Sequence, residues 1–224
     1  MISHTTRPLV RHRLRSPRAA AVAGIAFALL IGTSLVLIQS SIPAEPADEG
    51  LWLLEYSNNV SVAVTLVPFA AIAFLWFMGV IRDQLGDQED QFFSTILYGS
   101  GLLFLGRLFA WMGSIAAILA SYAVKSTAWL DSGAYIFART LMNVMGGVVA
   151  LRMAGVFMFS SGTIWIRTDV MPRWLTWLTY LVALGLLIGA GTHRILRIAF
   201  PIWVLIVSIF ILWGSLRRER EEEK

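Results

Sequence analysis

Hydrophobic and polar residues divide the chain into six long apolar stretches separated by short polar segments. A helix needs about 20 apolar residues to cross a hydrocarbon core of about 30 Å, and each stretch is close to that length. The pattern predicts an all-α integral membrane bundle of six transmembrane helices in one domain, residues 1–224, with spans at about 19–38, 60–81, 95–120, 134–160, 175–191 and 198–216. The short segment 192–197 predicts a tight hairpin between the last two spans.

Composition supports a membrane location. The 224 residues are 57% hydrophobic and 14% charged, whereas soluble domains carry about 25% charged residues. The net charge of +4 sits in segments that flank the apolar stretches, so we interpret it as topology and lipid contact rather than nucleic-acid binding. The chain has no cysteine, which excludes disulfides, thiolate metal sites and a cysteine nucleophile.

The distribution of basic residues predicts that both termini are cytoplasmic, because short cytoplasmic loops carry an excess of Lys and Arg. In this orientation the outer flanks hold only Lys125, Arg194 and Arg197. The cytoplasmic side holds Arg7, Arg11, Arg13, Arg15, Arg18, Arg82, Arg167, Arg173, Arg217, Arg218, Arg220 and Lys224.

The first apolar stretch allows a second interpretation as a secretory signal peptide. Arginines precede it, and Ser41-Ile42-Pro43-Ala44 follows it like a cleavage site. A run near 20 residues is longer than a typical signal core, so we expect an uncleaved helix. The stretch containing Glu45, Asp48 and Glu49 then forms an acidic outer loop without Lys or Arg.

Several short segments carry a family resemblance: Pro68–Phe77 (PFAAIAFLWF), the residues Arg82, Asp83, Gly86, Glu89, Asp90, Phe92 and Phe93, and the segments Ala20–Gly24 (AAVAG) and Pro172–Leu175 (PRWL). Together they resemble uncharacterised bacterial multi-pass membrane proteins of the domain-of-unknown-function type. The resemblance implies a six-helix protein of the bacterial plasma (inner) membrane. It implies no activity.

The loop RDQLGDQED between the second and third spans is the densest polar motif. Gly86 suits the residue that follows a helix C-terminus, and Asp87 with Asp90 has the spacing of a capping box. We therefore expect a structural role, with docking of a cytoplasmic partner as the alternative. The charged loop residues in question are Arg82, Asp83, Asp87, Glu89 and Asp90.

Three arginines lie within the predicted spans: Arg107, Arg139 and Arg152. An arginine at the bilayer centre costs about 2.5–3.5 kcal/mol on insertion scales, so such residues usually face the bundle interior or a partner. Arg107 lies about 18 Å into the third span at about 1.5 Å per residue, near the midplane. It shares a seven-residue stripe with Ser100, Ser114 and Ser121, which we expect to point inwards.

The fourth span places Arg139 and Asn143 on one face, with Asn143 near the depth of Arg107. Gly146 and Gly147 follow, allowing a close helix approach or a local break. The predicted spans contain no Asp or Glu, so the expected charge partners of Arg139 are the outer residues Glu55 and Asp131.

Arg107 has no acid within predicted reach. Two interpretations stay open for it. Its hydrogen bonds go to carbonyls, hydroxyls and Asn143, or it binds an anion such as a lipid headgroup. The spacing Gly185-x-x-x-Gly189 in the fifth span likewise predicts packing within the bundle first and dimerisation second.

No catalytic, cofactor or metal-binding residues are predicted, because the three histidines do not pair within a span and no nucleophile motif occurs. The first hypothesis is a non-enzymatic interaction or accessory/assembly subunit, with membrane lipids and other membrane-protein subunits as partners. The alternative is a small-anion or lipid-headgroup binding protein or carrier that uses Arg107, Arg139 and Asn143. A membrane enzyme comes third.

Overall fold

The computed structural model describes residues 17–45, 48–85, 91–124, 130, 133–146, 148–189 and 196–222. Regular structure in these ranges is entirely helical, as predicted. The helices are α1 (Pro17–Ser41), α2 (Trp52–Glu55), α3 (Ser57–Leu85), α4 (Gln91–Val124), α6 (Gly133–Gly146), α7 (Val148–Thr168), α8 (Arg173–Gly189) and α9 (Leu196–Glu222).

The helices have the length and composition of a membrane protein. Five segments of the described chain are long and apolar enough to cross a bilayer: Arg18–Ser41, Ser57–Gly79, Phe92–Val124, Gly133–Thr168 and Leu196–Arg217. The predicted fourth span corresponds to two helices, because α6 ends at Gly146 and α7 begins at Val148. The predicted fifth span is α8, a shorter apolar helix of 17 residues.

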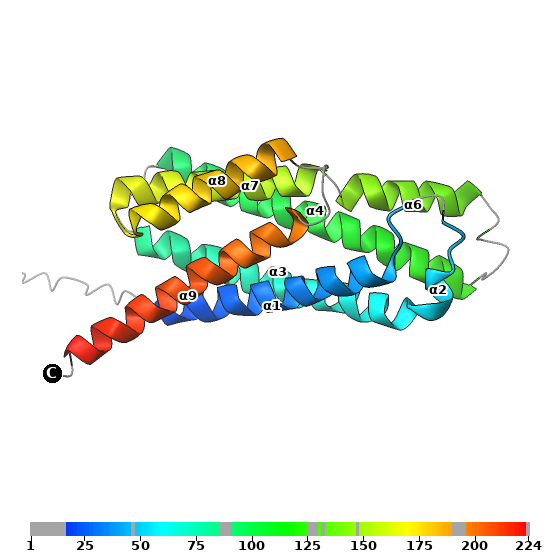
Figure 1. Cartoon of the computed structure of the whole chain (residues 1–224), viewed down its shortest axis with the longest axis horizontal. Helices are drawn as coiled ribbons and strands as arrows, with labels where there is room; N and C mark the ends of the chain where they lie inside the picture. Colours follow the sequence, from blue (N-terminus) through cyan, green and yellow to red (C-terminus); the bar gives the residue numbers. More distant parts are fainter. Residues whose placement is uncertain are drawn as a thin grey trace, which may run out of the picture.

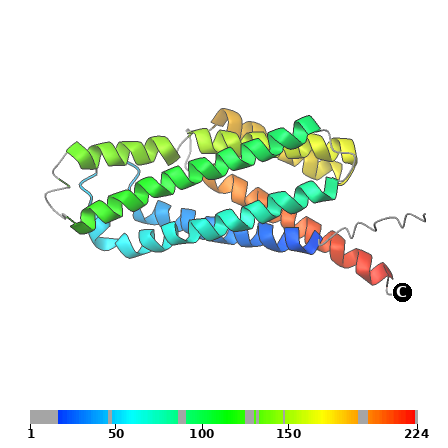
Figure 2. The same ribbon diagram turned by 180° about the vertical axis from the view of Figure 1, so that it is seen from behind.

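The helices lie roughly along the long axis of the molecule (Figures 1 and 2). We call the end that carries α2 the α2 end. α1 and α3 run side by side, α4 crosses the bundle, and α6 and α7 cover different lengths of α4. α7 and α8 pack together, while α9 crosses α1 and projects beyond the other helices at the end opposite α2.

The predicted tight hairpin of α8 and α9 is not what the structure shows. The two helices diverge, and each packs mainly against another partner, α8 against α7 and α9 against α1 (Figure 1). The reason lies in α1, where small residues let α9 approach closely. A Cβ atom at Gly24 would overlap the hydroxyl of Ser208 on α9 and lie 2.7 Å from the ring of Phe77.

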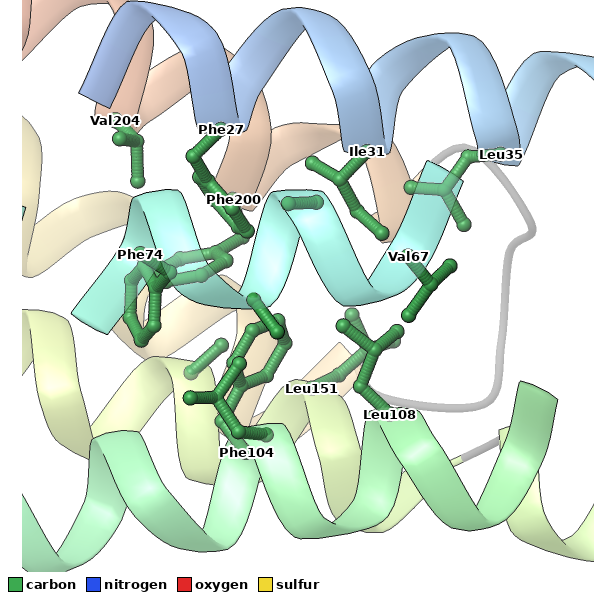
Figure 3. Packing of buried hydrophobic residues seen from close by; sticks show 14 of the residues in the cluster. Phe27, Ile31, Leu35, Val67, Phe74, Phe104, Leu108, Leu151, Phe200 and Val204 are labelled. Atoms are coloured by element: carbon green, nitrogen blue, oxygen red, sulfur yellow. The ribbon is translucent and has the colours of Figure 1, made fainter. Parts of the chain in front are cut away.

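An aromatic cluster joins five helices in the middle of the bundle. Phe27, Phe74, Phe104, Phe157 and Phe200 come from α1, α3, α4, α7 and α9, and all five are buried. Ring centroids are 4.8 Å apart for Phe27 and Phe74, and 4.8 Å apart for Phe104 and Phe200. Figure 3 shows rings of this cluster pointing toward one another. Such pairs add about 0.5–1.5 kcal/mol beyond area burial, so this cluster is the centre of the core.

Gly185 does not pack inside the bundle, although the Gly185-x-x-x-Gly189 spacing predicted this use first. It is exposed, and a Cβ atom built there would meet no atom within 4 Å. The expected use of this spacing for packing inside the bundle is therefore wrong for Gly185 among the described residues. The face of α8 that carries it also exposes Trp177, Leu181 and Ile188. This is the surface that α8 would present to lipid or to another protein.

Candidate functional site

Arg139 on α6 is fully buried and forms an ion pair with Asp48, which lies between α1 and α2. Its Nε atom donates to Oδ2 of Asp48 at 2.9 Å, and its Nη2 atom contacts the same oxygen. Nη2 also donates to the carbonyl oxygens of Pro43 at 3.2 Å and Glu45 at 3.0 Å. The guanidinium is thus surrounded by oxygen atoms of one short segment of the chain.

Two aromatic side chains complete this arrangement. The hydroxyl of Tyr135, one turn before Arg139 on α6, donates to Oδ1 of Asp48. The indole Nε1 of Trp52 donates to the Tyr135 oxygen at 3.1 Å, and the Arg139 guanidinium carbon lies 5.9 Å from the Trp52 ring centroid. A buried charge needs a partner and further hydrogen bonds to be tolerated, and this cluster supplies both. We call Asp48, Trp52, Tyr135 and Arg139 the outer cluster.

A local turn brings Asp48 into place. The backbone N–H of Gly50 donates to Oδ1 of Asp48 at 2.8 Å. Gly50 has a φ of 73°, a left-handed conformation that favours glycine. The turn holds the carboxylate towards α6. By contrast, Glu55, an expected partner of Arg139, is exposed at the end of α2, and Asp131 lies outside the described residues. Sequence reasoning recognised the acidic loop but did not single out Asp48, Tyr135 or Trp52.

Arg107 on α4 binds the C-terminal end of α6. Its Nη2 atom donates to the carbonyl oxygens of Val144 and Met145, both at 3.1 Å, and Nη1 lies 2.9 Å from the Met145 sulfur. The last carbonyls of a helix lack intrahelical partners and carry partial negative charge. Arg107 therefore caps α6 from a neighbouring helix. This agrees with the interpretation in which its hydrogen bonds go to groups of the protein, and the groups observed are carbonyls.

The close approach predicted at the two glycines is confirmed at Gly146. A Cβ atom at this position would overlap the indole ring of Trp111 on α4, so only glycine lets the two helices meet here. The guanidinium carbon of Arg197, at the start of α9, lies 5.5 Å from the Trp111 ring centroid. The end of α6, the middle of α4 and the start of α9 therefore meet at one level.

The predicted trio of Arg107, Arg139 and Asn143 does not form one site in the described residues. Arg139 lies in the middle of α6 and bonds the segment between α1 and α2, whereas Arg107 on α4 bonds the C-terminal end of α6. Asn143 is half-buried without a hydrogen bond to either arginine. On the expected stripe of α4, Ser100 is buried while Ser114 and Ser121 are half-buried. Arg152 is exposed on α7.

The polar loop after the second span lies largely outside the described residues, including Asp87, Glu89 and Asp90. Arg82 and Asp83 belong to the last turn of α3, which ends at Leu85, one residue before Gly86. Within the described ranges, no three His, Asp or Glu side chains come together as a potential metal site.

Comparison with protein-family models, with curated proteins and with solved structures finds no match to the chain.

Proposed function

We propose that the chain spans a bacterial inner membrane six times with both termini in the cytoplasm. The five long helices supply five crossings. α8 supplies the sixth, because 17 residues cover about 26 Å at about 1.5 Å per residue, close to the thickness of the hydrocarbon core. An even number of crossings is supported by Figure 1, in which α1 begins and α9 ends at the same end of the bundle. The excess of basic residues near those ends favours the cytoplasmic side.

Within that membrane, we propose that the protein acts through contacts with other membrane proteins, as a non-enzymatic accessory or assembly subunit. The observation that carries this proposal is the bonding of its two interior arginines. Arg139 is bonded to Asp48 and two carbonyls, and Arg107 to the end of α6. Intramembrane charges often mark ligand or ion sites, but here the chain uses both guanidinium groups to hold its own segments together.

An exposed face of α4 supports the proposal of a protein partner. Gly99, Gly106 and Gly113 recur every seven residues, all three are exposed, and a Cβ atom at any of them would meet nothing within 4 Å. Small residues on a lipid-facing helix let another helix come close enough for extensive van der Waals contact. A seven-residue repeat keeps such a seam on one side of the helix.

The test compares two substitutions at glycines where an added Cβ atom would meet no other atom within 4 Å. Gly106→Leu fills the proposed contact face of α4, whereas Gly214→Leu adds the same side chain on α9, where a Cβ atom also meets nothing within 4 Å. Each tagged variant is purified gently with its membrane surroundings, and the stoichiometry of any co-purifying membrane protein is measured. We expect Gly106→Leu to lose a partner that wild type and Gly214→Leu retain. Equal recovery of that partner in all three would contradict the use of this face.

The alternative is a protein that binds or carries a small anion or a lipid headgroup. One observation favours it: Nε of Arg107 is buried and has no hydrogen-bond partner among the described residues, although the side chain as a whole is only half-buried. A phosphate-bearing headgroup supplies the oxygen acceptors that such an atom lacks. Native mass spectrometry of wild type and Arg107→Met separates this alternative from the first proposal, because only the alternative predicts that the variant loses a bound phosphate-bearing lipid.

A further inference from the structure

Three arginines lie at the level where α6 ends and α7 begins. Arg107 on α4 bonds the last carbonyls of α6, and Arg152 is exposed one turn inside α7. The guanidinium carbon of Arg197, at the start of α9, lies 5.5 Å from the ring of Trp111, which packs against Gly146. An exposed arginine is costly in the middle of the acyl chains, whereas near their boundary it extends its charge to the headgroups. The level of these arginines therefore suits a boundary of the hydrocarbon core.

From this level to the end of the bundle opposite α2, the helices are as long as a hydrocarbon core is thick. α7 has 21 residues, which cover about 32 Å at about 1.5 Å per residue. The first residue of α4, Gln91, is about 30 Å from Trp111 along the same helix. The apolar part of α9, Leu196–Arg217, has 22 residues and covers about 33 Å. A core about 30 Å thick therefore fits between the arginine level and that end.

The exposed surface of α4 changes at the same level. Before Trp111 the helix exposes large apolar side chains, among them Leu102, Leu103 and Phe109. After Trp111 the exposed residues as far as position 123 are all small, namely Gly113, Ala117, Ala120 and Ala123. Large apolar side chains favour insertion among acyl chains, and glycine and alanine gain much less from it. The change of surface thus agrees with a boundary close to Trp111.

Beyond this level, the α2 end exposes polar side chains. They are Glu45, Glu49, Glu55, Asn58 and Asn59. Exposed carboxylates are costly among acyl chains, so this end lies outside the hydrocarbon core. Arg139 belongs to the same region, because it bonds Asp48 and two carbonyl oxygens of the segment between α1 and α2. α6 itself extends from the arginine level towards the α2 end (Figure 1).

We propose that α6 and the outer cluster stand outside the hydrocarbon core, and that α7 alone makes the crossing within Gly133–Thr168. The inference rests on the proposed six-crossing topology, in which the α2 end is the outer side. Arg139 is then a charge of the outer surface layer, although its predicted span placed it inside the membrane. The apolar side chains that α6 exposes contact the outer lipid headgroups instead of acyl chains; they include Ile136, Phe137 and Val144.

The test measures the depth of α6 with a fluorescent label. The chain contains no cysteine, so one introduced thiol carries a bimane group at a single position. Phe137→Cys on α6 and Phe159→Cys on α7 form a matched pair, because both phenylalanines are exposed, by 69% and 47%. Each labelled protein is placed in lipid nanodiscs. Quenching is then measured with iodide in the water and with doxyl groups attached to the middle of the acyl chains.

We expect iodide to quench the label at position 137 about fivefold or more as strongly as the label at position 159, and acyl-chain doxyl groups to show the reverse order. Doxyl quenching at position 137 as strong as at position 159 would overturn the proposal, because α6 would then lie among acyl chains. Protection of position 137 from both quenchers would also overturn it, because protein would then cover α6. If Phe137→Cys does not assemble, Ile136→Cys, at a residue that is 58% exposed, gives the same comparison.

Failure of the topology is distinguishable from failure of this inference. Both faces of a nanodisc are open to solvent, so quenching measures depth whichever side is the outer one. A membrane-impermeant maleimide applied to intact cells measures the side, and we expect it to label Phe137→Cys from outside. Labelling only after the cells are opened would contradict the proposed topology and would still support a position of α6 outside the hydrocarbon core.

Discussion

The Nη2 atom of Arg107 lies 3.1 Å from the carbonyl oxygen of Met145, in the final turn of α6. This contact explains how an arginine is accommodated within an apolar helix whose predicted span contains no acid. The C-terminal end of a helix carries roughly half a negative charge and several unpaired carbonyls. Arg107 supplies donors and a positive charge at the position where α6 ends.

The capping role of Arg107 predicts a loss of stability when its donors are removed. Arg107→Met keeps an unbranched side chain but leaves the Val144 and Met145 carbonyls without this partner. Hydrogen bonds to charged groups contribute about 1.5–3 kcal/mol each, so we expect a fall of about 2 kcal/mol in the free energy of unfolding. Denaturant titration in detergent measures it. The control is Arg152→Met on the exposed side of α7, where we expect a change below about 0.5 kcal/mol. Equal effects of the two substitutions would contradict the capping role.

The close packing of α1 against α9 predicts sensitivity at Gly24. A Cβ atom there would overlap the Ser208 hydroxyl, whereas at Gly32 on the same helix it would meet nothing within 4 Å. We expect Gly24→Ala to lower the melting temperature through overpacking that costs about 1–3 kcal/mol, and Gly32→Ala to be neutral.

A second substitution tests the cause of the Gly24 effect. Ser208 is fully buried, and its hydroxyl has no hydrogen-bond partner among the described residues. Adding Ser208→Ala to Gly24→Ala removes the atom that a new Cβ would strike, so we expect part of the stability to return. A double variant no more stable than Gly24→Ala alone would show that Ser208 is not the obstacle.

The positions of the helices could be predicted from the sequence because hydrophobic length sets them. The predicted span 60–81 lies within α3, Ser57–Leu85, and 175–191 nearly coincides with α8. The directions in which α8 and α9 diverge could not be predicted, because they depend on small residues such as Gly24 in a different helix. Apolar length determines where a helix lies along the chain, but side-chain shape determines its neighbours.

The charge partner of Arg139 shows the same limit. The sequence favours Glu55 as this partner, because an N-terminal extension of the second span would include Glu55 in the same helix. In the structure, α2 ends at Glu55, α3 begins at Ser57, and the turn at Gly50 folds Asp48 towards α6 instead. Helical periodicity places residues on faces of one helix and says nothing about a loop that returns across the bundle. The sequence did contain one signal for Asp48. The acidic segment around it has no Lys or Arg of its own, and a buried arginine elsewhere in the chain needs an acidic partner.

The bonding of Arg107 predicts how its substitution affects bound lipid. If the guanidinium serves only to cap α6, native mass spectrometry of the purified protein should show the same anionic lipids on wild type and on Arg107→Met. If the alternative function is correct, Arg107→Met should lose a phosphate-bearing lipid that wild type retains. Repeating the measurement with added inorganic phosphate distinguishes a lipid headgroup from a free anion. Displacement of the bound lipid by phosphate indicates a site that takes a free anion, and retention of the lipid indicates a site for the lipid headgroup.

The proposed topology predicts that both ends of the chain face the cytoplasm. A reporter fused after Lys224 should give a cytoplasmic signal, and a reporter inserted in the segment between α1 and α2 should give an outer signal. Outer signals from both reporters would mean an odd number of crossings. In that case α8 would not cross the bilayer, and the five long helices would be the full set of spans.

The central claim is that the chain functions through stable contact with another membrane protein. The most direct measurement is the mass of the particle extracted from its own membrane in polymer-bounded lipid discs, without detergent. We predict a mass that exceeds the 24.9 kDa of the chain by that of a stoichiometric protein partner, and that returns to the mass of the chain alone in Gly106→Leu. A monodisperse wild-type particle containing this chain alone would contradict the account.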